Sequence, residues 1–152
     1  PGPTGTLQSL HPAAETAEET AAPPTPASTP TPTAIPPSVT PDSPFILLSQ
    51  EKICDKPLNT PLFQIEALDR FNQPLAGALV IVSWDGGQER FFTGLKPELG
   101  VGYADFRPAT DVLYSVRLGE NGTPVLGLAA VMCSQSSGAP VWGAWLLRFV
   151  QP

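Results

Sequence analysis

The segment from Phe63 to Phe92 constrains the fold most strongly, because it combines period-two alternation with two tight turns. Phe63, Ile65 and Ala67 occupy every second position, which is the alternation of a half-buried strand. Residues 69–74 then supply Asp, Asn and Pro, whose side chains favour turns. The Asp-Gly-Gly sequence at 85–87 is typical of a β-hairpin, because glycine tolerates positive φ. This segment therefore predicts a strand, a turn, a second strand, a hairpin and a returning strand.

Short apolar segments separated by Pro, Gly and Asn continue through residues 45–152. No segment has the periodicity of a packed amphipathic helix. Cys54 falls on a short strand or a strand end. Seven or eight short strands at regular spacing predict an all-β antiparallel sandwich, Ig-like or transthyretin-like in class. The expected strands are 45–50, 63–68, 78–84, 88–92, 101–107, 112–118, 125–133 and 141–150.

The composition changes sharply at Pro44. Residues 1–44 hold twelve of the twenty prolines, nine threonines and no Lys or Arg, whereas all Trp, Phe and Cys follow later. The first part has too little apolar surface to offset its chain entropy. We therefore predict a Pro/Thr/Ala-rich stalk at 1–44 and one sandwich domain at 45–152.

The stalk composition favours polyproline II, in which 44 residues would extend over about 130 Å. Thr and Ser between prolines are also typical of O-glycosylated stalks, and an unmodified linker is the alternative. The candidate O-glycosylation sites are Thr25, Thr29, Thr31 and Thr33.

The charge and hydropathy pattern excludes several classes of function. The chain has a net charge of −6 and no basic cluster, which is a poor match to a phosphate backbone, so we expect no nucleic-acid partner. It has no apolar run of about 18 residues, so we expect no membrane span. The sequence starts at Pro1, which favours a processed mature form or an excised segment.

Cys54 and Cys133 are the only cysteines, and both lie beside apolar strands. A disulfide in an exported domain is the favoured interpretation, and two buried thiols are the alternative. Two cysteines cannot complete a structural zinc site, and the single histidine, His11, lies in the stalk. We therefore expect a secreted or cell-surface location and no metal or cofactor.

The sequence contains no recognisable catalytic arrangement. His11 is the only histidine, so a Ser–His–Asp triad has no base within the sandwich domain. The acidic residues of the domain fall on turns and solvent faces without calcium-loop spacing. No phosphate-binding glycine motif and no nucleophile elbow occurs. We therefore predict no catalytic residues and no enzymatic activity.

Apolar residues on both faces of several strands predict an interface. Leu79 and Ile81 point away from Val80 and Val82, and Trp145 faces the opposite side from Trp142. The apolar segment that follows the stalk either opens the sandwich of its own chain or pairs with the open sheet edge of a neighbour. The candidate assembly residues are Phe45, Ile46, Leu47, Leu48, Leu79, Ile81 and Trp145.

Several motifs resemble the carboxypeptidase regulatory-like, or transthyretin-like, β-sandwich modules. They are Asp69-Arg-Phe-Asn-Gln-Pro-Leu-Ala-Gly-Ala78, Val80 with Val82, Gly102-Tyr-Ala-Asp-Phe106 and Tyr114-Ser-Val116. The resemblance covers about half of the domain, and Asn72 stands where the family usually has Gly. It implies a building unit of secreted or surface proteins, sometimes one that binds sugars, without activity of its own.

Two functions are compatible with these features. The first is a non-catalytic extracellular structural protein, a surface or filament subunit that self-assembles through its N-terminal segment and apolar strand faces into a homo-oligomer or fibre. The alternative is a carbohydrate-binding or accessory module of a secreted protein. In that alternative, the candidate glycan contacts are Tyr103 and Trp145, whose rings could stack on a sugar.

Overall fold

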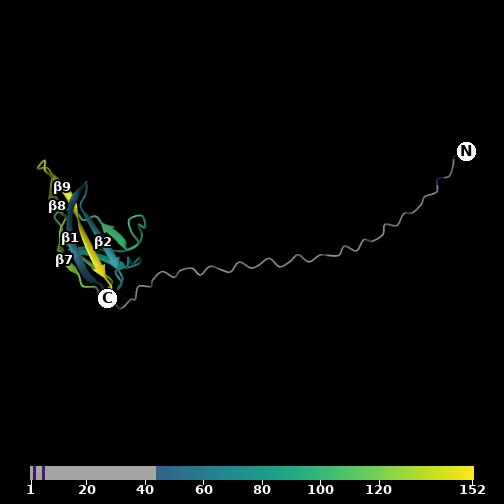
Figure 1. Ribbon diagram of the computed structural model, residues 1–152, viewed down its shortest axis with the longest axis horizontal. Helices are drawn as coiled ribbons and strands as arrows, with labels where there is room; N and C mark the ends of the chain where they lie inside the picture. The colour runs from purple at the N-terminus through teal and green to yellow at the C-terminus, as the bar shows by residue number, and fades with distance from the viewer. Residues whose placement is uncertain (1, 3–4, 6–43) are drawn as a thin grey trace. The chain divides into compact units, whose positions relative to one another are not determined.

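The structure, a computed structural model, describes residues 44–152 together with Gly2 and Gly5 (Figure 1). Almost all of the predicted stalk therefore lies outside the described residues. The same holds for the candidate O-glycosylation sites Thr25, Thr29, Thr31 and Thr33 and for His11. These predictions stay predictions.

Residues 44–152 form an all-β fold without a helix, as predicted, in two sheets that share one core. Sheet A has the order β1-β9-β2-β5, with β8 pairing to the start of β9, and sheet B has the order β4-β3-β6-β7. Sheet A contains β1 (Ile46–Leu58), β2 (Leu62–Leu68), β5 (Tyr103–Phe106), β8 (Met132–Ser134) and β9 (Pro140–Val150). Sheet B contains β3 (Leu79–Trp84), β4 (Gly87–Phe92), β6 (Tyr114–Leu118) and β7 (Val125–Leu128).

The pairing differs from a purely antiparallel sandwich at one place. β2 and β9 run parallel, with Leu62 opposite Ala144 and Leu68 opposite Val150, whereas the other strand pairs are antiparallel. In Figure 1, the C-terminal strand β9 lies between β1 and β2, which agrees with the register. The last strand is therefore central in sheet A, although no local signal in the sequence indicates this.

Two strand boundaries also differ from the prediction, so that nine strands replace seven or eight. Residues 46–58 form one strand, because β1 pairs with β9 from Ile46 to Ile53 and again at Leu58 and absorbs two register shifts. Pro57 is tolerated because β1 is an edge strand. Conversely, residues 125–133 divide into β7 and β8, since Gly127 has a φ of 71° and the chain passes from sheet B to sheet A.

The core lies between the inward faces of the two sheets. The predicted alternation is confirmed, because Phe63, Ile65 and Ala67 of β2 are fully buried. The largest fully buried side chains come from both sheets and from the segments flanking them. They are Phe45, Phe63, Phe149, Ile65, Leu75, Ile81, Leu118, Leu128, Leu147, Val80, Val82 and Val116.

The register places the first and the last strand residues of the sandwich at the same end of the fold. Ile46 at the start of β1 pairs with Val150 at the end of β9, so Pro44 and the C-terminus lie at the same end (Figure 1). Trp142 lies near the start of β9, about 27 Å along the strand from Val150. It pairs with Leu58 of β1 and with Met132 of β8. We call this opposite end the distal end.

Thr93 is a buried polar residue that joins the β2–β3 connection to the end of β4. Its Oγ1 accepts a hydrogen bond from the backbone N–H of Ala78 at 3.0 Å and donates one to the carbonyl of Leu75 at 2.7 Å. Thr93→Val would leave both backbone groups buried without this partner, so we expect it to lower the free energy of unfolding by about 2 kcal/mol. Urea denaturation measures this, and Thr93→Ser should remain close to the native protein. Equal stability of the Val and Ser variants would contradict the assignment.

Candidate functional site

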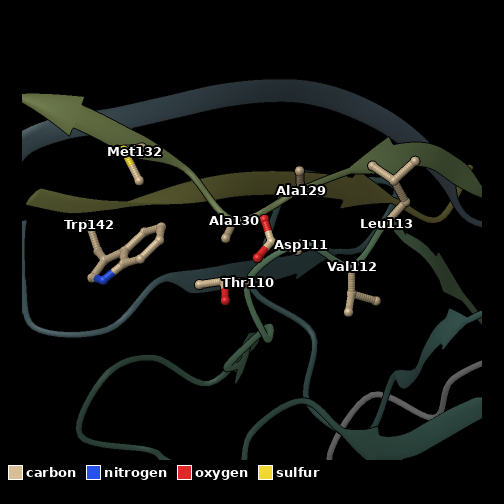
Figure 2. Close-up of a pocket in the computed structure, with 8 residues that line it drawn as sticks. All are labelled: Thr110, Asp111, Val112, Leu113, Ala129, Ala130, Met132 and Trp142. Atoms are coloured by element: carbon tan, nitrogen blue, oxygen red, sulfur yellow. The ribbon is translucent and has the colours of Figure 1, made fainter. Parts of the chain in front are cut away.

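The distal end carries an open groove of about 380 Å³. Figure 2 shows Trp142 at one side, Leu113 at the other and Asp111 between them. Its walls come from the β5–β6 loop, the β7–β8 connection and the starts of β8 and β9. The lining residues are Thr110, Asp111, Val112, Leu113, Ala129, Ala130, Met132 and Trp142.

A second, shallower hollow of about 310 Å³ shares Leu113 with the groove. The residues that line it are Ser83, Trp84, Leu113, Tyr114, Ser115, Leu126 and Gly127. Leu113 is 67% exposed, Met132 63% and Leu126 73%. We call the groove and this hollow together the distal apolar surface. Exposed apolar groups that adjoin one another in this way mark interaction sites more often than isolated ones do.

The distal apolar surface contains little charge. Asp111 is the only ionisable residue with a carboxylate or basic group among those that line the groove and the hollow. It adopts a φ of 63°, which Asp tolerates better than most residues. Most of the side chains that line the groove are therefore apolar.

Sequence reasoning did not identify most of this surface. Residues 129–132 were expected inside one continuous strand, whereas β7 ends at Leu128 and leaves Ala129 and Met132 exposed. The opposite orientation of Trp142 and Trp145 was the one available signal. The structure agrees with it, since Trp145 packs against the core and Trp142 lines the groove.

The apolar segment after the stalk pairs within its own chain. Phe45 is buried in the core, and Ile46 and Leu47 pair with Val150 and Phe149 of β9. This is the intrachain alternative that the sequence left open. Ile46 and Leu48 remain exposed on the edge strand, so any contact between molecules at Phe45–Leu48 stays a prediction.

Ile81 does not provide the exposed apolar surface that was expected of it. It is fully buried on the outer side of sheet B, where its cross-strand neighbours are Arg90 and Arg117. Residues opposite each other share a face, so the aliphatic stems of the two arginines cover Ile81. Glu120 forms ion pairs with both guanidinium groups. The expectation of exposure at Ile81 is therefore wrong, whereas Leu79 in the same strand is partly exposed.

Trp145 has intramolecular partners on several sides. Its indole N–H donates to the carbonyl of Ala129 at 3.0 Å, and Lys52 Nζ lies 5.0 Å from the ring centroid. The ring also packs against the core. A stacking surface for a sugar at Trp145 therefore has no geometric support in this conformation, and its role as an assembly contact stays a prediction.

Tyr103 lies at a different place, on the outer face of sheet A. It lines a cleft of about 240 Å³ with Glu66, Ala67, Pro74, Leu99, Gly100 and Gly102. Its hydroxyl donates to Asp105 Oδ2 at 3.3 Å, and Lys96 Nζ binds the same carboxylate at 2.7 Å. Burial, reinforced by the negative charge of Asp105, raises the pKa of Tyr103 to about 12. The Tyr103 hydroxyl therefore remains protonated around neutral pH.

Glu66 and Arg148 stand beside Tyr103 on the same face. Glu66 is opposite Tyr103 of β5 in one direction and Arg148 of β9 in the other. Arg148 Nε donates to Glu66 Oε2 at 2.7 Å, and this bond raises the pKa of Arg148. Arg148 also lies 3.8 Å from Glu51 of β1. The outer face of sheet A is thus an ordered row of paired charges.

Cys54 of β1 and Cys133 of β8 form a disulfide, as predicted, with their Cα atoms 5.7 Å apart. It joins the exposed edge strand to the shortest strand of sheet A. Among residues 44–152, no group of three or more His, Cys, Asp or Glu could hold a metal ion. The described part of the chain also has no helix long and apolar enough to cross a membrane.

The fold and these surfaces define a disulfide-linked, two-sheet all-β protein. No protein-family model matches the chain, and no curated protein or solved structure is significantly similar to it. The resemblance to carboxypeptidase regulatory-like modules therefore stays a prediction from the motifs.

Proposed function

We propose that this chain is an exported, non-catalytic structural protein that self-associates through its distal apolar surface. The observation that carries the proposal is the exposure of Leu113, Leu126 and Met132 around two adjoining hollows. The disulfide is compatible with an extracellular location, because such bonds persist in oxidising compartments. The site offers no pair of titratable groups for acid–base catalysis, which supports a structural role.

A second copy of the chain is the partner that fits this surface. The surface carries projecting leucines and hollows side by side, so a two-fold axis would place each projection in a hollow of the other copy. The centres of interfaces are depleted in charge and enriched in Met and aromatic residues, as this surface is. Such a dimer would place the two Pro44 residues at opposite ends, so that the pair connects two stalks.

Association through the edge of β1 has less support. The central and C-terminal part of this strand carries Glu51, Lys52, Asp55, Lys56 and Pro57. Charged residues and proline on an edge strand disfavour pairing with another chain. We therefore place the contact at the distal end instead of the strand edge.

A finer description of the fold as Ig-like or transthyretin-like is also part of this proposal. Its support is Tyr114 at the start of β6, whose hydroxyl accepts the backbone N–H of Ala109 at 2.9 Å. This resembles the tyrosine corner, in which a tyrosine near a strand start bonds the backbone a few residues upstream.

Sedimentation velocity of the full chain between about 10 µM and about 1 mM tests the self-association. We expect a concentration-dependent dimer for the native chain and a monomer for Leu113→Asp/Leu126→Asp, since a carboxylate in an apolar interface is costly to desolvate. The control is Leu95→Asp, because Leu95 is 72% exposed and lies in the β4–β5 loop away from the distal end. A native monomer throughout this range, or a dimer that survives both distal substitutions, would refute the proposal.

A further inference from the structure

The Tyr103 cleft combines apolar walls with fixed polar groups, and the self-association proposed above does not involve it. It lies between the β2–β3 turn and the β4–β5 loop, with Leu99 and Pro74 beside the Tyr103 ring. Leu99 is 56% exposed although it is apolar. Sites for small molecules usually show this combination of apolar lining with a few placed polar groups.

The loop that forms one wall is held in place by its own backbone. The N–H groups of Leu99 and Gly100 donate to the carbonyl of Lys96, and the N–H of Tyr103 donates to the carbonyl of Gly100. A Cβ at Gly102 would collide with the backbone of Ala67 and with Leu75 N, so only glycine permits this close approach. The cleft is therefore formed before any ligand arrives.

The carboxylates at and beside the cleft are fixed in orientation, and each is neutralised by an ion pair. Glu66 is paired with Arg148, and Asp105 is paired with Lys96. Arg148 occupies Glu66 Oε2, and Oε1 makes no hydrogen bond within residues 44–152. A charged ligand would compete with an existing ion pair, whereas a neutral ligand with hydroxyl donors could use Oε1 without disturbing it.

The Tyr103 hydroxyl already has a partner in Asp105, so we expect a ligand to contact the ring of Tyr103. An aromatic ring beside a carboxylate acceptor suits a molecule with one C–H-rich face and hydroxyl groups around its rim. At about 240 Å³ the cleft is smaller than a site for a drug-sized molecule, which limits the ligand to one ring.

We propose that the Tyr103 cleft binds one neutral hexopyranose unit of a glycan, with the sugar against Tyr103 and Leu99 and a sugar hydroxyl donating to Glu66. The proposal goes beyond the structural role and is independent of it. A monomeric chain can bind the sugar, and a dimeric chain can fail to bind it.

The test is a titration of the ¹⁵N-labelled full chain, followed by amide chemical shifts. The probes are the methyl glycosides of glucose, galactose, mannose and N-acetylglucosamine, with methyl glucuronide and methyl glucosaminide as charged counterparts, up to about 50 mM. We expect saturable shifts at Gly100, Gly102 and Tyr103 with at least one neutral probe and weaker binding of its charged counterparts. No saturable shift with any neutral probe, tighter binding of a charged probe, or shifts confined to the distal end would overturn the proposal.

Variants separate the cleft from the rest of the surface. Tyr103→Ala and Leu99→Ala should each weaken binding about tenfold, and Tyr103→Phe, which keeps the ring, should change it by less than about threefold. Leu99 is exposed, so Leu99→Ala decides the question if Tyr103→Ala unfolds. Leu113→Ala at the distal end is the matched control and should bind as the native chain does. Unchanged binding by Leu99→Ala and Tyr103→Ala would overturn the assignment.

Discussion

Removal of the Cys54–Cys133 disulfide should lower the free energy of unfolding by about 4 kcal/mol. The bond joins residues 79 apart in sequence, and the chain-entropy model assigns roughly this value to a loop of that length. The total free energy of unfolding of small domains is only about 5–15 kcal/mol, so the reduced protein should be only marginally stable. Urea denaturation of the native chain with and without a thiol reductant measures the change.

The Cys54→Ala/Cys133→Ala variant provides the control for this experiment. It should match the reduced native chain in stability, and the reductant should have no further effect on it. Cys54 lies on the edge strand β1, and Cys133 lies on the three-residue strand β8. A loss of less than about 1 kcal/mol would show that β1 and β8 are held by their β9 pairing alone.

Phe63→Ala should lower the free energy of unfolding by about 3–5 kcal/mol. Phe63 is fully buried, and its ring centroid lies 5.6 Å from that of Tyr114 and 6.0 Å from that of Phe106. Truncation removes the burial of the ring and leaves a cavity between the two sheets, which the surrounding strands can fill only in part. Tyr114 and Phe106 belong to different sheets, so the loss affects the contact between them.

The matched control for this variant is Phe92→Ala. Phe92 has the same side chain but is about half exposed at the end of β4, so its truncation should cost less than about 1 kcal/mol. Thermal or chemical denaturation of both variants gives the comparison. Equal effects of the two substitutions would contradict the assignment of Phe63 to the shared core.

The proposed surfaces could be predicted only in part. Tyr103 was identified from its residue type, and the structure adds the cleft, the ordered Glu66–Arg148 pair and the exposed Leu99 around it. The distal apolar surface was missed because its residues come from segments that meet only where the chain passes between sheets. Exposure depends on such neighbours, and residue type alone does not specify them.

The amino-acid sequence alone determined the all-β class and the identity of the disulfide partners. Period-two alternation and turn residues act locally, so they can be read from neighbouring positions, and two cysteines allow a single intrachain pairing. The tertiary structure decided that β9 lies between β1 and β2, that Arg90 and Arg117 cover Ile81, and that Trp142 rather than Trp145 lines an open groove. These features depend on contacts between residues distant in the chain, because the register between strands sets which side chains meet and which remain exposed.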